Sequence, residues 1–267
     1  MIPTQRVFIA GNSGSGKTTG AWRWYLSRMP RRIVLDQTGE WEGYTDITAT
    51  SLTDFVSAVR EMHSKPKWTI AYTLDDDRFD DLIRWLIPVP NVYASPVTAL
   101  GGAVMLVDEV DLVAGQNNTS REVRTLYRRS RHTGLTVVSA TTRPANVSRE
   151  VSAQSTHILA YHLSEPRDRD YIADIMRWDS QAVDRWMAWT RLHPHGAAWK
   201  EAQTGRLLWL PDQGPPLADS KALAALAASP VASPPLLSPS PPQPRQLPES
   251  PPVAESQDNP EDDEPDG

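Results

Sequence analysis

The stretch GNSGSGKTT, residues 11–19, constrains the possible folds of this chain more than any other segment. Gly11 and Gly16 bracket four residues and are followed by Lys17 and Thr18, which completes the phosphate-loop pattern G-x-x-x-x-G-K-[ST]. The apolar segment RVFIA precedes it and an amphipathic segment follows it, so the motif lies between a predicted strand and a predicted helix. A glycine- and serine-rich turn without a function is a poor alternative, because all four fixed positions match.

Such a loop binds nucleotide phosphates through its backbone. Glycines let successive N–H groups and the helix N-terminus face a polyanion, the Lys17 ammonium adds a point charge near the β- and γ-phosphates, and the Thr18 hydroxyl ligates Mg²⁺. We therefore expect ATP and Mg²⁺ as cofactors. The predicted nucleotide-binding residues are Gly11, Asn12, Ser13, Gly14, Ser15, Gly16, Lys17, Thr18 and Thr19.

A second motif, GGAVMLVDEVD (101–111), is an apolar strand that ends in two acids. Asp108 is predicted to hold Mg²⁺ together with Thr18. Glu109 supplies the carboxylate with which a hydrolase orients or deprotonates water, whereas a small-molecule kinase does not need one. The alternative is a buried strand with acids at its solvent end. The distance between the two motifs leaves room for two intervening strands.

Apolar strands alternate with amphipathic helices along the chain. This pattern predicts an α/β fold: a P-loop NTPase of the ASCE, RecA-like type with a central, mostly parallel sheet flanked by helices. The segment 88–96 contains three prolines, which argue against regular structure there. Predicted strands cover 6–10, 31–36, 67–74, 101–111, 135–144 and 155–163, with a closing hairpin at 196–200 and 206–210. Predicted helices cover 18–28, 51–64, 75–87, 119–134, 165–178 and 180–189.

Composition divides the chain into an ATPase domain, residues 1–210, and a tail, residues 211–267. The tail holds 15 of the 24 prolines, which predicts a disordered, partly polyproline II segment. Its last 22 residues carry eight acids and no Lys or Arg, so residues 1–245 have a net charge of +2 although the whole chain has −6. There is no cysteine, and no apolar run reaches the roughly 18 residues of a membrane span. We expect a cytoplasmic protein without a signal peptide.

The third informative region is 127–172. It resembles the HerA/FtsK superfamily of DNA-pumping ATPases, and most resembles the genome-packaging ATPases of tailless, membrane-containing viruses. Members have an Arg-Lys/His-x-Gly turn, a strand ending in Thr-Gln-Arg-Pro, and later a Ser-Gln strand with an Asp-rich helix start. The corresponding residues here are 131–134, 141–144, 152–154 and 167–170. VLDQTGEW (34–41) also resembles the superfamily's second strand, which commonly ends in Asp followed by an acidic-aromatic pair.

The resemblance implies two further catalytic residues. Thr142 occupies the position of a γ-phosphate sensor that is usually Gln, and its hydroxyl has a shorter reach. Arg131 matches the arginine that acts on the γ-phosphate of a neighbouring subunit, which implies a ring-shaped homo-oligomer, a hexamer by resemblance. The alternative for Arg131 is a solvated arginine favoured by the helix dipole.

Other polar and aromatic residues allow two interpretations. Arg128 and Arg129 could contact DNA phosphates or belong to a solvated face. Most tryptophans fall on amphipathic helices, which favours core packing or subunit contact over base stacking. Asp75–Asp77 fit a helix N-terminus better than a metal site. His157, His162, His193 and His195 lack metal-ligand partners and are expected to be structural or surface residues.

The combined expectation is an ATP hydrolase that pumps double-stranded DNA, as a viral genome-packaging motor does. The same resemblance allows the protein to be associated with the virion as well as with the host cytoplasm. The tail could dock on a capsid vertex or membrane protein, or only keep the ring soluble. The alternatives are a conjugative or chromosomal translocase, an assembly or secretion ATPase like the zonula occludens toxin group, and a small-molecule kinase. DNA-stimulated hydrolysis separates a DNA motor from an assembly factor.

Overall fold

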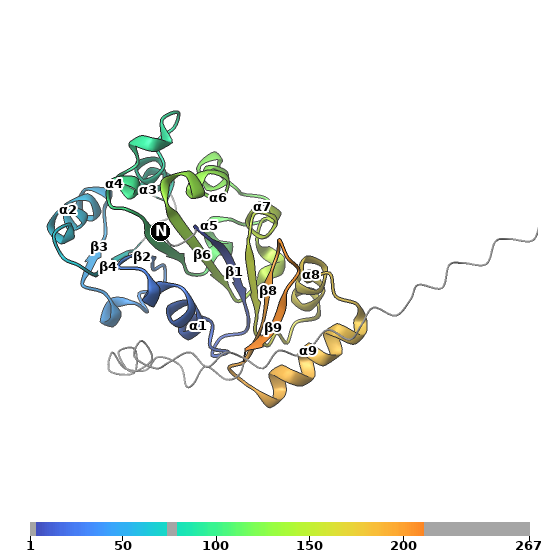
Figure 1. Cartoon of the computed structure of the whole chain (residues 1–267). Coiled ribbons are helices and arrows are strands. Elements are labelled where there is room, and N and C mark those ends of the chain that lie inside the picture. Colours follow the sequence, from blue (N-terminus) through green and yellow to red (C-terminus); the bar gives the residue numbers. More distant parts are fainter. Residues whose placement is uncertain (1–3, 74–78, 211–267) are drawn as a thin grey trace, which may run out of the picture. The chain divides into compact units, whose positions relative to one another are not determined.

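The computed structural model describes residues 4–73 and 79–210, and within them nine strands form a single sheet (Figure 1). The strand order is β3-β4-β2-β5-β6-β1-β7-β8-β9. The first seven strands in this order, from β3 at the edge to β7, are mutually parallel. Strands β8 and β9 form an antiparallel hairpin that pairs with β7. The predicted mostly parallel sheet and its closing hairpin are confirmed. The strands are β1 Arg6–Ala10, β2 Arg31–Leu35, β3 Ile47–Ala49, β4 Trp68–Tyr72, β5 Ala103–Val107, β6 Leu135–Thr141, β7 His157–Ala160, β8 Ala197–Glu201 and β9 Leu207–Leu210.

Helices cover both faces of the sheet, as the fully apolar strands require. One face packs against α1 and the 3-10 turn that follows it at Leu26–Arg28, where Trp22 and Leu26 meet alternate residues of the central strands. The other face packs against the remaining large helices through side chains such as Phe55, Leu126 and Trp186. The α-helices are α1 Lys17–Trp24, α2 Leu52–Met62, α3 Phe79–Leu86, α4 Pro96–Ala99, α5 Val110–Val113, α6 Arg121–Thr133, α7 Arg149–Ala153, α8 Pro166–Met176 and α9 Ser180–Leu192.

Local signals set the helix ends where the sequence predicts them. The Ser51 hydroxyl accepts a hydrogen bond from the Asp54 N–H and caps α2. Gly134 closes α6 in a left-handed conformation (φ 81°), which costs a glycine little because it has no Cβ. Of the tryptophans, Trp41, Trp68 and Trp186 are among the largest fully buried side chains, so the core-packing interpretation holds for them.

Two predictions about the first half of the chain were wrong. Three strands, not two, separate β1 from β5, because the three-residue β3 is too short to show a periodic pattern among turn-forming residues. The segment 88–96 does contain regular structure: a 3-10 turn at Val92–Ala94 and the start of α4. Pro96 occupies the first turn of α4, where a missing N–H costs nothing, and Ser95 caps the helix.

Some sequence predictions fall outside the described residues. These are the acidic residues Asp75–Asp77 and the whole proline-rich segment 211–267, so the predicted boundary after residue 210 stays a prediction. In the part of the chain that the structure describes, no helix combines the length and the apolar character needed to cross a membrane.

Candidate nucleotide-binding site

The phosphate loop connects β1 to α1 at the carboxyl edge of the sheet. Gly14 and Gly16 have φ angles of 72° and 97°, in the left-handed region that other residues rarely adopt. At Gly11 an added Cβ would lie 2.5 Å from the Cβ of Tyr161, the residue that follows β7. The three glycines therefore fit the positions where the loop turns tightly or passes close to a neighbouring strand.

Backbone hydrogen bonds hold the loop against the strands on both sides of β1. The Gly11 N–H donates to the Thr141 carbonyl (3.3 Å) and the Asn12 N–H to the His162 carbonyl (2.9 Å). The Lys17 side chain is buried, and its Nζ donates to the Asn12 carbonyl at 3.0 Å. The loop is thus already curled around its lysine, as a phosphate-binding turn requires.

The two predicted acids follow β5, and β5 is separated from β1 only by β6. Asp108 is buried, and its Oδ1 accepts a hydrogen bond from the Glu109 N–H at 3.2 Å. Glu109 has φ 49° and ψ 54°, a left-handed conformation that is uncommon for a residue with a side chain and is often found at functional sites.

Thr142, the candidate sensor, lies at the end of β6 between the two motifs. Its hydroxyl donates to Glu109 Oε2 at 3.3 Å, so the side chain reaches the predicted base from the strand next to it. The preceding residue, Thr141, donates to Asp111 Oδ1 at 2.6 Å and accepts from the Arg143 N–H. Two successive threonines therefore tie the β6 end to the segment that carries Glu109.

These residues line one cavity of about 290 Å³. Lys17, Thr18, Asp108, Glu109 and Thr142 all contribute to its wall, so the structure brings together both motifs and the sensor position. The other lining residues come from the phosphate loop and from the segment after β2, and they are Ser13, Gly14, Gly16, Thr19, Thr38, Glu40, Trp41 and Tyr44.

The segment after β2 contributes an arrangement that the sequence analysis did not foresee. The buried Asp36 carboxylate accepts hydrogen bonds from the N–H groups of Gly39, Glu40 and Trp41 at 2.9–3.1 Å. The turn so formed buries Trp41, whose indole Nε1 donates to Asp108 Oδ2 at 2.9 Å. We call this turn, residues 36–41, the Trp41 clip. The Asp-x-x-Gly spacing at its start is typical of such a turn, but it does not reveal the bond to Asp108.

Burial and like charges shift the titration of the clustered groups. Burial raises the pKa of Asp108, and the Trp41 hydrogen bond and the Lys17 charge oppose that shift. Burial also raises the pKa of Glu109, and the neighbouring charges of Asp108 and Asp111 raise it further. Burial lowers the pKa of Lys17, whereas the nearby carboxylates favour its charged form. A carboxylate with a raised pKa is a better proton acceptor, which suits a general base.

The donor set fits Mg²⁺ bound jointly with a nucleotide. Thr18 and Asp108 offer a hydroxyl and a carboxylate, the hard oxygen ligands that Mg²⁺ prefers. No group of three or more His, Asp or Glu residues within the described part of the chain forms a metal site by itself. In nucleotide sites Mg²⁺ usually keeps several water and phosphate ligands and takes only one or two ligands from the protein.

Arg131 lies far from this cavity within its own subunit. It is exposed in the last turn of α6, where its Nε donates to His132 Nε2 at 3.3 Å. Burial lowers the pKa of Arg6 at the start of β1, and the charge of Arg131 lowers it further, so the two arginines are neighbours at the amino edge of the sheet. Arg128, one turn earlier, is paired bidentately with Glu150, whereas Arg129 is exposed.

Comparison with solved structures gives the same fold. The genome packaging NTPase B204 of Sulfolobus turreted icosahedral virus 2, in complex with ATP-γS, matches with a TM-score of 0.62 and 17% identity over 80% of this chain and 100% of that one. B204 of Sulfolobus turreted icosahedral virus matches with a TM-score of 0.59 and 15% identity over 79% and 99%.

A third match is VirB4 of Thermoanaerobacter pseudethanolicus, with a TM-score of 0.53 and 11% identity over 79% of this chain and 90% of that one. No family model and no curated protein matches the sequence. The chain therefore shares its fold with these packaging NTPases and with VirB4, which agrees with the fold that the motifs predict.

Proposed function

We propose that the chain is the ATP-hydrolysing subunit of a motor that moves double-stranded DNA, of the kind that packages viral genomes. The observation that carries this proposal is the position of Glu109. Its carboxylate lines the same cavity as Lys17 and receives the Thr142 hydroxyl, which is where a residue that activates water would lie. The likeness to two virus packaging ATPases supports the choice of cargo.

The proposal assigns a role in ATP hydrolysis to each of these side chains. The loop N–H groups and Lys17 hold the phosphates, Glu109 accepts a proton from the attacking water, and Thr142 fixes the Glu109 carboxylate and responds to the γ-phosphate. Mg²⁺, held by Thr18 and Asp108, would neutralise phosphate charge when bound. Arg131 of a neighbouring subunit completes the site, and the working form is therefore a ring.

The first expected result is that duplex DNA stimulates ATP hydrolysis. A DNA motor couples turnover to contacts with backbone phosphates, and those contacts weaken steeply as salt rises. Steady-state hydrolysis is measured with and without linear duplex DNA, at about 50 mM and about 200 mM salt. Stimulation that is lost at the higher salt supports the motor, whereas hydrolysis that ignores DNA at both salt concentrations supports an assembly or secretion ATPase instead.

The Trp41 clip gives a second expected result. Trp41→Phe keeps most of the buried ring and removes the indole donor from Asp108. A hydrogen-bond partner fixes the orientation of a metal-binding carboxylate, and its loss typically costs about 10–100-fold in metal affinity. We therefore expect roughly ten-fold more Mg²⁺ to be needed for half-maximal ATP hydrolysis, while nucleotide binding without Mg²⁺ stays unchanged.

Trp22→Phe is the matched control. The Trp22 ring lies 6.4 Å from that of Trp41 and is also buried, but its Nε1 has no hydrogen-bond partner among the described residues. The two variants lose the same ring volume from the same layer, and only one of them loses a bond to Asp108. Equal Mg²⁺ requirements in both variants would mean that Trp41 only fills space.

A further inference from the structure

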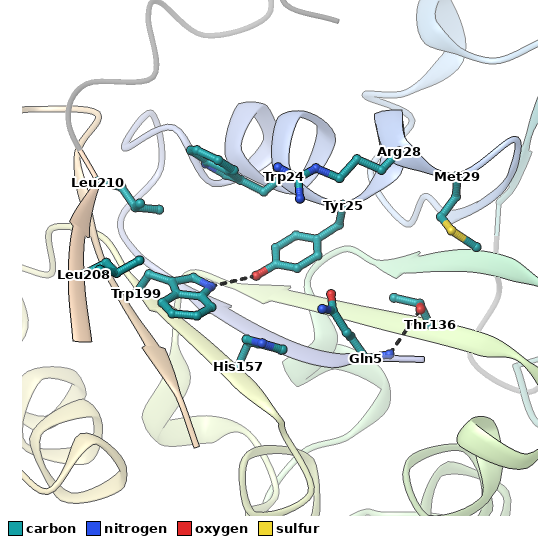
Figure 2. Close-up of a pocket in the computed structure, with 10 residues that line it drawn as sticks. All are labelled: Gln5, Trp24, Tyr25, Arg28, Met29, Thr136, His157, Trp199, Leu208 and Leu210. Atoms are coloured by element: carbon teal, nitrogen blue, oxygen red, sulfur yellow. Dashed lines mark hydrogen bonds between the residues drawn. The ribbon is translucent and has the colours of Figure 1, made fainter. Parts of the chain in front are cut away.

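A second cavity, of about 240 Å³, lies on the α1 face of the sheet, between the amino ends of β6 and β7 and the β8–β9 hairpin, and we call it the aromatic cavity (Figure 2). Its walls come from the end of α1 and the turn after it, from the first residues of β6 and β7 and the residue before β1, and from the β8–β9 hairpin. The lining residues are Gln5, Trp24, Tyr25, Arg28, Met29, Thr136, His157, Trp199, Leu208 and Leu210. It shares none of them with the nucleotide cavity.

The surface inside the aromatic cavity is mostly apolar, because several of its polar groups already bond one another. Trp199 Nε1 donates to the Tyr25 hydroxyl at 3.2 Å, and the Gln5 N–H donates to the Thr136 hydroxyl at 3.2 Å (Figure 2). The His157 ring lies 5.2 Å from the Trp199 ring. An apolar cavity of about 150 Å³ is enough to bind benzene, so this one can take apolar side chains of a peptide.

Besides the Gln5 side-chain amide and the His157 ring, the polar groups at the aromatic cavity include hydrogen-bond donors and positive charges. Trp24 Nε1 is buried without a hydrogen-bond partner among the described residues. The guanidinium groups of Arg23 and Arg28 lie 5.7 and 5.6 Å from the centre of the Trp24 ring. A complementary ligand therefore offers apolar groups, carbonyl acceptors and negative charge.

The chain itself continues from the wall of this cavity. Leu210 ends β9, lines the cavity and is followed by 57 further residues. The first ten, PDQGPPLADS, contain three prolines, two aspartates and no Lys or Arg. Proline offers a carbonyl acceptor and no N–H donor, and aromatic-lined grooves are a common binding surface for proline-rich segments. The segment thus offers the proline residues, carbonyl acceptors and negative charge that complement the aromatic cavity.

We propose that the aromatic cavity is the docking site of residues 211–217 of the same chain. Seven residues reach at most about 25 Å, enough to fold back from Leu210 over a neighbouring cavity. Tethering places the segment at an effective concentration on the order of millimolar, so a weak peptide site is filled within the chain. Docking would hold the first residues after Leu210 against the α1 face of the sheet.

Disulfide trapping in the full-length chain tests this proposal, because the sequence contains no cysteine that would interfere. We pair Met29→Cys, on the cavity wall, with Leu217→Cys. A matched control pairs Leu217→Cys with Leu112→Cys, at an exposed position on α5 beyond the carboxyl edge of the sheet. On mild oxidation we expect the cavity pair to form an intramolecular disulfide about ten-fold faster than the control pair, because docking raises the effective concentration of residue 217 at the cavity wall and not at α5.

A second cysteine pair tests the proposal without a substitution at a more buried position such as Met29. Arg28→Cys lies at an exposed position of the cavity wall. The substitution removes one of the two guanidinium groups beside Trp24 but no buried side chain, and its pair with Leu217→Cys is still expected to close faster than the control. Pro215→Ser with Pro216→Ser should slow both cavity pairs. Equal closure rates in cavity and control pairs overturn the proposal, and so do disulfides that form only between two chains. None of these readouts depends on ATP hydrolysis, so the result is independent of the proposed function.

Discussion

Glu109→Gln is expected to abolish ATP hydrolysis while leaving ATP binding intact. The substitution keeps the size and shape of the side chain and can still accept the Thr142 hydroxyl, but an amide cannot accept a proton from water. General-base catalysis contributes about 10²–10⁴-fold to a rate, so we expect a loss of at least about 100-fold in turnover. Steady-state phosphate release and the affinity for a fluorescent ATP analogue are measured on the same preparation.

Two features make this prediction specific. The raised pKa of Glu109 comes from its burial and from Asp108 and Asp111, so the carboxylate is poised to take up a proton rather than merely to carry charge. Glu122→Gln is the control, since Glu122 is a carboxylate on α6 that pairs with Arg84, away from the cavity. Hydrolysis that persists in Glu109→Gln, or ATP binding that is lost with it, would contradict the role of Glu109 as base.

Much of this site could be predicted from the sequence, because its main parts are continuous motifs at strand ends. A phosphate loop needs fixed glycines, and an acidic pair after an apolar strand needs no other element to be recognised. In parallel strands the carboxyl ends share one edge, so the loop and the residues that follow β5 and β6 had to meet once the sheet was predicted. The structure places Lys17, Glu109 and Thr142 around one cavity accordingly.

The other features of the fold and the site depend on contacts between segments that are distant in the sequence, and the periodicity of apolar residues does not predict such contacts. The bond from Trp41 to Asp108 joins residues 67 positions apart, and it exists because Asp36 folds the chain into a turn after β2. The contact of Gly11 with Tyr161 likewise joins the first and seventh strands. Short elements such as β3 and α4 were missed because three or four residues carry too few apolar positions to define a repeat.

Arg131→Ala is expected to reduce ATP hydrolysis by about 10³-fold without changing ATP affinity, as loss of an arginine supplied by a neighbouring subunit does. The reason is geometric. Arg131 lies at the amino edge of the sheet next to Arg6, whereas the nucleotide cavity lies at the carboxyl edge, so the side chain cannot reach the phosphates of its own subunit. Arg129→Ala is the control, because Arg129 is an exposed arginine on the same helix.

Mixing two inactive variants distinguishes a role in trans from a merely structural one. In a ring that contains both Arg131→Ala and Glu109→Gln subunits, some interfaces combine an intact Glu109 with an intact Arg131 supplied by the neighbour. Hydrolysis should therefore reappear in the mixture, rise to a maximum near equal proportions and require that the two proteins assemble together. A structural or solvated arginine gives no such recovery, since each Arg131→Ala subunit would remain defective whatever its neighbour. Recovery in the mixture thus tests Arg131, Glu109 and the ring together. If both single variants fold and bind ATP but the mixture shows no recovery, Arg131 does not act on the neighbouring subunit's nucleotide.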